Sequence, residues 1–287
     1  MSLDTFSKLR YAYPRHSIPT LKQLRARVVD LCGFQPVFFD CCIDSCICYA
    51  GKYSDLQCCP KPGCGKPRLD ADGKPKKTFT YLPLIPCLAA LATNAEFATK
   101  MDYRAEYVST AGEIHDIFDG QHYRELLNKF VNINGKEYSF KYFSDHRDIA
   151  LALATDGVGP FRNRRNQTCW PLLVFLLNLN PKWRTHLKNI LSLGVIPGPK
   201  KPWEIESFLY PFISELLDLA IGIKSFDIRR QELFLQRAYL LLAFGDIPAV
   251  SAIMCIKGHN ATYPCCFCKI QGIGDPEGQK TLYVPLS

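Results

Sequence analysis

A dense block of cysteines near the N-terminus constrains the fold more than any other feature of the sequence. Eight of the 14 cysteines lie between Cys32 and Cys64. The first 21 residues lack the basic and then apolar pattern of a secretory signal, so we expect an intracellular chain with reduced thiols. In a reducing compartment, clustered cysteines are metal ligands more often than disulfides. We therefore expect this part of the chain to fold around a metal ion.

Four of these cysteines form the most favourable ligand set. Cys42 and Cys46 are separated by three residues, and Cys59 and Cys64 by four. Two short loops that each supply two thiolates suit the tetrahedral coordination of Zn²⁺. The spacing predicts a structural zinc ribbon or knuckle, and because four thiolates close the coordination sphere, we expect no catalysis there.

Two alternatives remain open for this block. Cys48 or Cys58 could replace one of the four predicted ligands, because neither spacing is the usual two-residue one. Cys32 and Cys41 are expected to be ordinary buried thiols. We expect turns around the last two ligands, supplied by Pro60, Pro62, Gly63 and Gly65.

Length and charge narrow the class of protein. With 287 residues, 47% of them hydrophobic, the chain can form one large or two modest domains. The longest apolar runs, 169–177 and 239–244, are shorter than the roughly 20 residues of a membrane span, so we expect no membrane partner. The net charge of +8 divides into +6 over residues 1–80, −2 over 81–144, +6 over 145–203 and −2 over 204–287.

The two basic blocks each contain a short run of cations. Such runs suit surfaces that contact phosphate, although a solvated basic face is the plainer interpretation. The runs are Lys74, Lys76 and Lys77 in the first block and Arg162, Arg164 and Arg165 in the second, which also contains Lys200 and Lys201.

The region between the blocks shows local structure but no site chemistry. Residues 89–100 are predicted to form a helix. Alternating apolar residues around Asn134-Gly135 predict a hairpin over 131–140.

From Asp148 onward the sequence predicts three strands, a helix and a fourth strand. Apolar runs bounded by Gly or Pro begin near residues 148, 169 and 189. Pro202 is predicted to begin the helix, in which apolar residues recur at spacings of three and four. The fourth run ends at Asp246, as the first ends at Asp156.

These two aspartates are the candidate catalytic residues. Acids at the tips of adjacent strands can share divalent metal ions, as in two-metal phosphoryl transfer. The order of elements is that of an RNase H-like nuclease core. The alternative is that both residues only open turns, Asp-Gly at 156 and Asp-Ile-Pro at 246.

Three segments carry a resemblance to a known family. The segments LATDGVGPFRNRRNQTCWPLLVFLLNLNP, IPGPKKPWEIESFLYPFISEL and AYLLLAFGDIPAVSAIMCIKGHNATYPCCFC resemble the catalytic region of CACTA-type (En/Spm-like) DNA transposases in their fungal form. The upstream cysteine block resembles the ribbon that precedes this region. The resemblance implies a DDE-type enzyme that cuts and joins DNA with Mg²⁺ or Mn²⁺, with Asp156 and Asp246 as its first two acids.

Two further expectations come from the resemblance. Cys265 and Cys268 match the family's Cys-x-x-Cys pair and would form half of a second metal site, which His259 or Cys255 could complete. The third acid of a DDE site lies on a helix well beyond the second, whereas the sequence ends 41 residues after Asp246. Glu277, in a Gly/Pro-flanked loop, is a poor substitute, so we expect a truncated or decayed copy.

The prediction is therefore an α/β chain with an incomplete RNase H-like core, a mixed sheet with flanking helices, preceded by a small zinc-ribbon-like region. Its expected parts are 1–80, 81–144 and 145–287. The expected function is that of a nuclear, transposase-derived protein that binds DNA and could form homo-oligomers. The alternatives are a non-catalytic zinc-dependent DNA-binding or assembly module, and a fragment with no stable fold.

Overall fold

The structure is a computed structural model in which the described residues are 3–13, 18–32, 34–159, 168–199, 201–257, 261–265, 268, 270–274 and 281–283. The chain divides into two units, Met1–Pro36 and Val37–Ser287, and each is described by itself. The first unit contains α1 (Leu3–Ala12) and α2 (Leu21–Cys32). Thr20 and Gln23 cap the start of α2 reciprocally, because each side-chain oxygen accepts the backbone N–H of the other.

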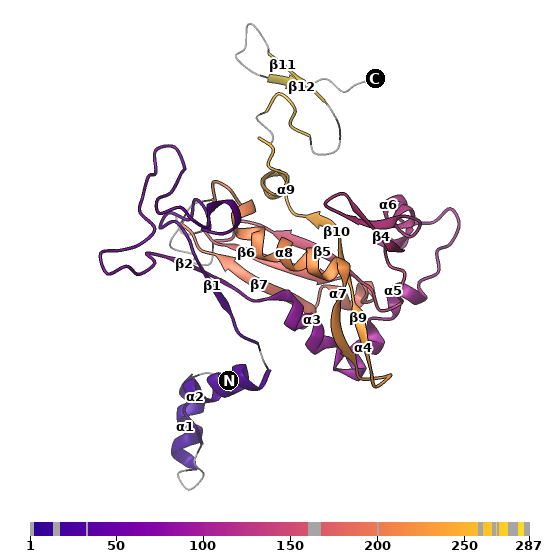
Figure 1. The fold of residues 1–287 in the computed structure, drawn as a ribbon, viewed down its shortest axis with the longest axis horizontal. Helices are drawn as coiled ribbons and strands as arrows, with labels where there is room; N and C mark the ends of the chain where they lie inside the picture. The colour runs from indigo at the N-terminus through magenta and orange to yellow at the C-terminus, as the bar shows by residue number, and fades with distance from the viewer. Residues whose placement is uncertain are drawn as a thin grey trace. The chain divides into compact units, whose positions relative to one another are not determined.

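A six-stranded mixed sheet forms the centre of the second unit (Figure 1). Its strand order is β1-β2-β7-β6-β5-β10. All neighbours are antiparallel except β5 and β10, which run parallel. This sheet confirms the predicted α/β class. The strands are β1 (Val37–Asp40), β2 (Thr78–Tyr81), β5 (Ile149–Thr155), β6 (Trp170–Leu176), β7 (Ile190–Ile196) and β10 (Ala238–Phe244).

Strand β5 lies between two hydrophobic cores. Successive side chains of a strand point to opposite faces. Accordingly, Leu151 and Leu153 belong to the core that α3 (Leu84–Ala92) and α8 (Glu206–Ile221) cover. Ala150 and Ala152 belong to the core beneath α6 (Gln121–Leu126) and a hairpin. Burial on both faces explains why β5 is apolar from Ile149 to Ala154.

The helix α8 (Glu206–Ile221) follows β7, as predicted, but it begins later than Pro202. The backbone N–H groups of Trp203 and Glu204 donate to the Cys46 carbonyl instead of starting the helix. A hairpin of β8 (Ile223–Asp227) and β9 (Glu232–Gln236), which the sequence did not predict, lies between α8 and β10.

The middle region contains two helices where one was predicted over 89–100. Asn94 separates them, because its Oδ1 accepts the Phe97 N–H and caps the second helix. The predicted hairpin is confirmed, and its turn has φ 52° at Asn134 and 83° at Gly135, as a type I′ turn requires. The elements are α3 (Leu84–Ala92), α4 (Ala95–Lys100), α5 (Tyr103–Glu106), α6 (Gln121–Leu126), β3 (Phe130–Ile133) and β4 (Lys136–Lys141).

The shorter elements lie in the connections. Among the residues that the structure describes, no helix combines the length and the apolar character needed to cross a bilayer. The connecting elements are η1 (Gly51–Tyr53), η2 (Ile117–Asp119), α7 (Pro181–Arg184), η3 (Leu187–Asn189), α9 (Ile247–Ile253), β11 (Gly272–Gly274) and β12 (Thr281–Tyr283).

Candidate functional site

Asp156 and Asp246 follow the same ends of two adjacent parallel strands. In the register of β5 and β10, Ala154 pairs with Phe244, and each aspartate lies two residues beyond its member of that pair. The carboxyl ends of parallel strands meet at one edge of a sheet, which is where ligands of open α/β sheets bind. The two aspartates therefore follow equivalent positions of β5 and β10 at this edge.

The residues just before the two aspartates are in close contact. A Cβ atom on Gly245 would lie 3.1 Å from the carbonyl oxygen of Thr155 and 3.1 Å from the Ala249 Cβ. Such spacing is tighter than most real Cβ contacts, so glycine allows the end of β10 to approach the end of β5. The sequence analysis did not identify Gly245, although its position directly before Asp246 could have indicated its importance for the site.

Both aspartates are exposed and only partly engaged. Asp156 Oδ1 accepts the Gly157 N–H at 2.6 Å, and Asp246 Oδ1 accepts the Ala249 N–H at 2.8 Å as the N-cap of α9. Asp246 thus opens a turn, as the alternative interpretation predicts, but this role uses only one of its two carboxylate oxygens. Within the described ranges, neither Oδ2 accepts a hydrogen bond, and carboxylate oxygens are the ligands that Mg²⁺ prefers.

Trp170 and Lys201 lie beside this edge. A Cβ on Gly157 would be 3.0 Å from the indole ring of Trp170. The Lys201 Nζ lies 5.6 Å from the centroid of that ring and donates to the Pro248 carbonyl at 3.4 Å. Lys201 therefore joins the start of β6, next to Asp156, to the start of α9, next to Asp246.

Two buried polar atoms near Asp156 lack hydrogen-bond partners among the described residues, Thr155 Oγ1 and Trp170 Nε1. A hydroxyl and an indole N–H can both pair with water or with a phosphate oxygen. Trp170 was not identified as a site residue from the sequence, because its role depends on contacts with Gly157 and Lys201.

The remaining predicted DNA contacts lie outside the described residues. These are Arg162, Arg164, Arg165 and Lys200. Val158 and Cys169, which flank the arginine run in sequence, pair in an isolated bridge just after Asp156. The described residues on either side of the arginine run therefore pair with one another close to Asp156 in sequence.

The structure brings together the four cysteines predicted as ligands. The Sγ atoms of Cys42, Cys46, Cys59 and Cys64 all lie within 4.8 Å of one another. Cys64 Sγ is 3.7 Å from Cys42 Sγ and 3.9 Å from Cys46 Sγ. Four sulfurs at about 2.3 Å from a tetrahedral Zn²⁺ are about 3.8 Å apart. The cluster could therefore hold a metal ion such as zinc.

The thiols of this cluster differ in their acidity. Burial raises the pKa of Cys46 to about 12 and raises that of Cys59 further. Burial opposes ionisation of Cys64 too, but hydrogen bonds from the Lys66 N–H and neighbouring thiols lower the pKa of Cys64. The lowered pKa of Cys64 favours its thiolate form, which is the form of cysteine that binds metals.

Three other cysteines of the block do not join the cluster, and the side chain of Cys32 lies outside the part of the chain that the structure describes. Cys41 and Cys48 are fully buried in the main hydrophobic core and face one another across an isolated bridge. Cys58 is exposed. The structure thus groups the first ligand set and not the alternatives with Cys48 or Cys58.

Residues 124–286 match the family described as Transposase family tnp2. The chain belongs to this family. The match covers more than half of the sequence and includes both aspartates, whereas the cysteine cluster precedes it. No curated protein matches the sequence.

The second cysteine pair lies within the region matched to the tnp2 family. Cys265 is partly buried and Cys268 exposed, and neither belongs to a metal-ligating group of the described residues. His259 is not described. Cys255 donates to Glu206 Oε1 at 3.0 Å, and burial together with this carboxylate raises the pKa of its thiol to about 11. A metal site at Cys265 and Cys268 remains a prediction.

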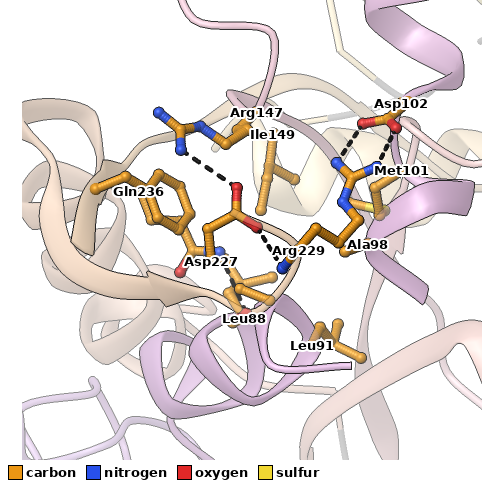
Figure 2. Close-up of a pocket in the computed structure, with 12 residues that line it drawn as sticks. Leu88, Leu91, Ala98, Met101, Asp102, Arg147, Ile149, Asp227, Arg229 and Gln236 are labelled. Atoms are coloured by element: carbon orange, nitrogen blue, oxygen red, sulfur yellow. Dashed lines mark hydrogen bonds and ion pairs between the residues drawn. The ribbon is translucent and has the colours of Figure 1, made fainter. Parts of the chain in front are cut away.

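A small cavity lies at the other end of β5 (Figure 2). It measures about 50 Å³, is mostly apolar, and lies between α3, α4 and the β8–β9 hairpin. Two ion pairs line it, Arg229 with Asp102 at 2.5 and 2.9 Å and Arg147 with Asp227 at 3.3 Å. These charges pair with one another, and the edge that carries the two aspartates is therefore the candidate site of this tnp2-family chain.

Proposed function

We propose that this chain is the DNA-processing core of a DDE-type, CACTA-like (En/Spm-like, fungal) transposase. The observation that carries the proposal is the placement of Asp156 and Asp246 at equivalent positions on two adjacent parallel strands. The partial strand order β7-β6-β5-β10, with only β10 parallel to its neighbour, is that expected of an RNase H-like core and supports the same conclusion.

The roles of the residues follow from their positions. Asp156 and Asp246 would each offer a carboxylate oxygen to Mg²⁺ or Mn²⁺. When bound, such ions activate the attacking oxygen and stabilise the leaving oxygen of a phosphodiester. Lys201 would hold the DNA backbone through its phosphates, and we propose the same role for Arg162, Arg164 and Arg165, which lie outside the described residues. DNA as the substrate implies a nuclear location.

The proposed site is incomplete, because it has no third acid among the described residues. Among the residues that the structure describes, Asp156 and Asp246 do not belong to any group of three or more possible metal ligands. Two carboxylates hold a divalent ion weakly and fix its geometry poorly. We therefore propose that the described residues supply only part of the catalytic set, and that strand transfer by them alone is slow.

The cysteine cluster has a structural role in this proposal. The sulfur separations of 3.7 and 3.9 Å suit Zn²⁺, and four thiolates leave no open position for a substrate. A second candidate function, a non-catalytic zinc-dependent DNA-binding or assembly module, is favoured by the absence of a third acid from the described site.

A DNA-nicking assay with Mn²⁺ separates the two functions. Asn is the substitution of choice, because Asp246→Asn keeps the side-chain oxygen that caps α9 while it removes the charge. We expect slow nicking of supercoiled DNA by the unmodified chain and none by Asp156→Asn or Asp246→Asn, with DNA binding retained. DNA binding with no nicking that depends on the aspartates would contradict the enzymatic function and support the binding module.

A further inference from the structure

Lys77 lies where the cysteine cluster meets the loop between β7 and α8. Its Nζ donates to the Ile43 carbonyl at 3.1 Å, to Ser45 Oγ at 2.7 Å and to the Gly198 carbonyl. Ser45 Oγ donates to the same Gly198 carbonyl at 2.9 Å. Ile43 and Ser45 lie between the ligands Cys42 and Cys46, so Lys77 ties the first cysteine loop to Gly198.

The connection from β7 to α8 is held by the same cysteine loop at its other end too. The Cys46 carbonyl accepts the N–H groups of Trp203 at 3.0 Å and Glu204 at 3.1 Å. The Glu204 carboxylate in turn pairs with Lys52 and the Tyr53 hydroxyl. The connection is thus attached to the cysteine region at Gly198 and again at Trp203 and Glu204, and Lys201 lies between these attachments.

On its other side the connection contacts the aspartate edge. The Pro199 carbonyl accepts the Thr168 hydroxyl at 2.9 Å. A Cβ on Gly198 would lie 1.8 Å from the Thr168 carbonyl oxygen, so only glycine fits this approach. Lys201 reaches Trp170 and Pro248, as described above.

The environment of Lys77 is not that of a cation that contacts DNA. Its side chain is partly buried, its three hydrogen-bond acceptors are neutral, and burial lowers the pKa of its ammonium group. The neighbouring Lys74 and Lys76 are exposed. Of the first basic run, Lys77 is therefore directed into the protein while the other two lysines remain at the surface.

We infer that Lys77 is a positioning residue, which uses the cysteine loop as an anchor to fix the 198–204 connection and thereby holds Lys201 beside Asp156 and Asp246. This inference rests on the proposed function only in the claim that Lys201 contacts DNA phosphate. It makes the cysteine cluster part of the architecture of the aspartate site, not a separate DNA-binding module.

Lys77→Met tests the inference, with Lys76→Met as the matched control. In Lys77→Met we expect faster hydrogen exchange at the amides of Trp203 and Glu204, with zinc content retained. We expect a roughly fivefold loss of affinity for duplex DNA and a decrease of about one in the slope of log affinity against log salt, as for loss of one phosphate contact. Lys76→Met should leave the exchange of both amides unchanged.

A double-mutant cycle with Lys201→Met identifies the route of the effect. If Lys77 acts through Lys201, the double variant should bind DNA no more weakly than Lys201→Met alone, because coupled residues are not additive. Additive losses, or unchanged exchange at Trp203 and Glu204 in a folded Lys77→Met protein, would overturn the inference.

Ser45→Ala provides a second route should Lys77→Met fail to fold. It removes the hydroxyl that joins Lys77 to Gly198 and leaves the lysine in place, so we expect a smaller increase in exchange at the same two amides. No increase in this variant would also overturn the inference. Failure of the unmodified chain to bind DNA would instead contradict the proposed function, because the exchange measurement does not depend on DNA.

Discussion

At the scale of single residues, Asp148 is the most buried of the acidic residues that the structure describes. It is 1% exposed, at the start of β5. Its backbone carbonyl accepts hydrogen bonds from Arg104 and Asn178, and one carboxylate oxygen accepts the Asp145 N–H at 3.1 Å. The other oxygen has no partner among the described residues. Burial therefore raises the pKa of Asp148 to about 6.

This raised pKa has a consequence for stability. An unfolded aspartate has a pKa of about 3.9, so between about pH 4 and pH 6 the folded state binds the proton more tightly. The contribution of Asp148 to the free energy of unfolding must then fall as pH rises through this range, by at most about 3 kcal/mol. We expect Asp148→Asn to gain stability relative to the unmodified chain over the same range, as measured by urea unfolding at several pH values. A difference that does not change with pH would contradict this account of Asp148.

At the scale of elements, β2 and β7 are paired through a single glycine. Gly194 has φ +152° and pairs with Tyr81, and a Cβ at this position would lie 2.5 Å from the Thr80 carbonyl oxygen. Strands β1 and β2 join the main sheet at this contact, and the cysteines from Cys41 to Cys64 lie between them in sequence.

Gly194→Ala should therefore destabilise the second unit. The added methyl group must displace backbone, and the left-handed φ is unfavourable for alanine, so we expect a loss of about 2–3 kcal/mol in urea unfolding. Gly274→Ala in β11 is the control, because its Cβ would meet no atom within 4 Å. Equal stabilities of the two variants would show that the close approach at Gly194 is not a constraint.

The elements also show which signals in the sequence were sufficient. Strands β5, β6, β7 and β10 were predictable because each is an apolar run bounded by Gly, Pro or Asp. The β8–β9 hairpin was not, since its turn uses Gln231 at φ 55°, where no Gly or Asn marks a turn. The start of α8 was misplaced because its first amides bond to Cys46, a long-range contact that no local pattern reveals.

The residues of the candidate sites likewise divide into those that local sequence patterns indicate and those that they do not. The grouping of the four cysteines was predictable from spacing and turn residues, and the placement of the two aspartates after adjacent strands was predictable from the apolar runs before them. Trp170 and Lys77 could not be assigned roles, because these depend on contacts with residues distant in sequence.

At the scale of the whole molecule, the cysteine cluster and the mixed sheet belong to one unit. We expect one zinc ion per chain by metal analysis, and we expect its removal with a chelator to lower the free energy of unfolding by about 3 kcal/mol or more. Cys59→Ser should lose the metal, because it removes one of the four clustered thiols. Cys58→Ser is the matched control, since Cys58 is exposed and adjacent in sequence. Retention of zinc by Cys59→Ser, or its loss from Cys58→Ser, would contradict the assigned ligand set.

The central claim is that Asp156 and Asp246 form one divalent-metal site at the carboxyl edge of β5 and β10. Affinity cleavage with Fe²⁺, ascorbate and peroxide tests it directly, because radicals formed at bound iron cut the nearby backbone whether or not the chain is an active enzyme. We predict cuts near both residues, and we expect Mg²⁺ to suppress them. Either substitution alone, Asp156→Asn or Asp246→Asn, should abolish the cuts at both positions. Cuts at neither residue, or the same cuts in the two Asn variants, would contradict a shared metal site.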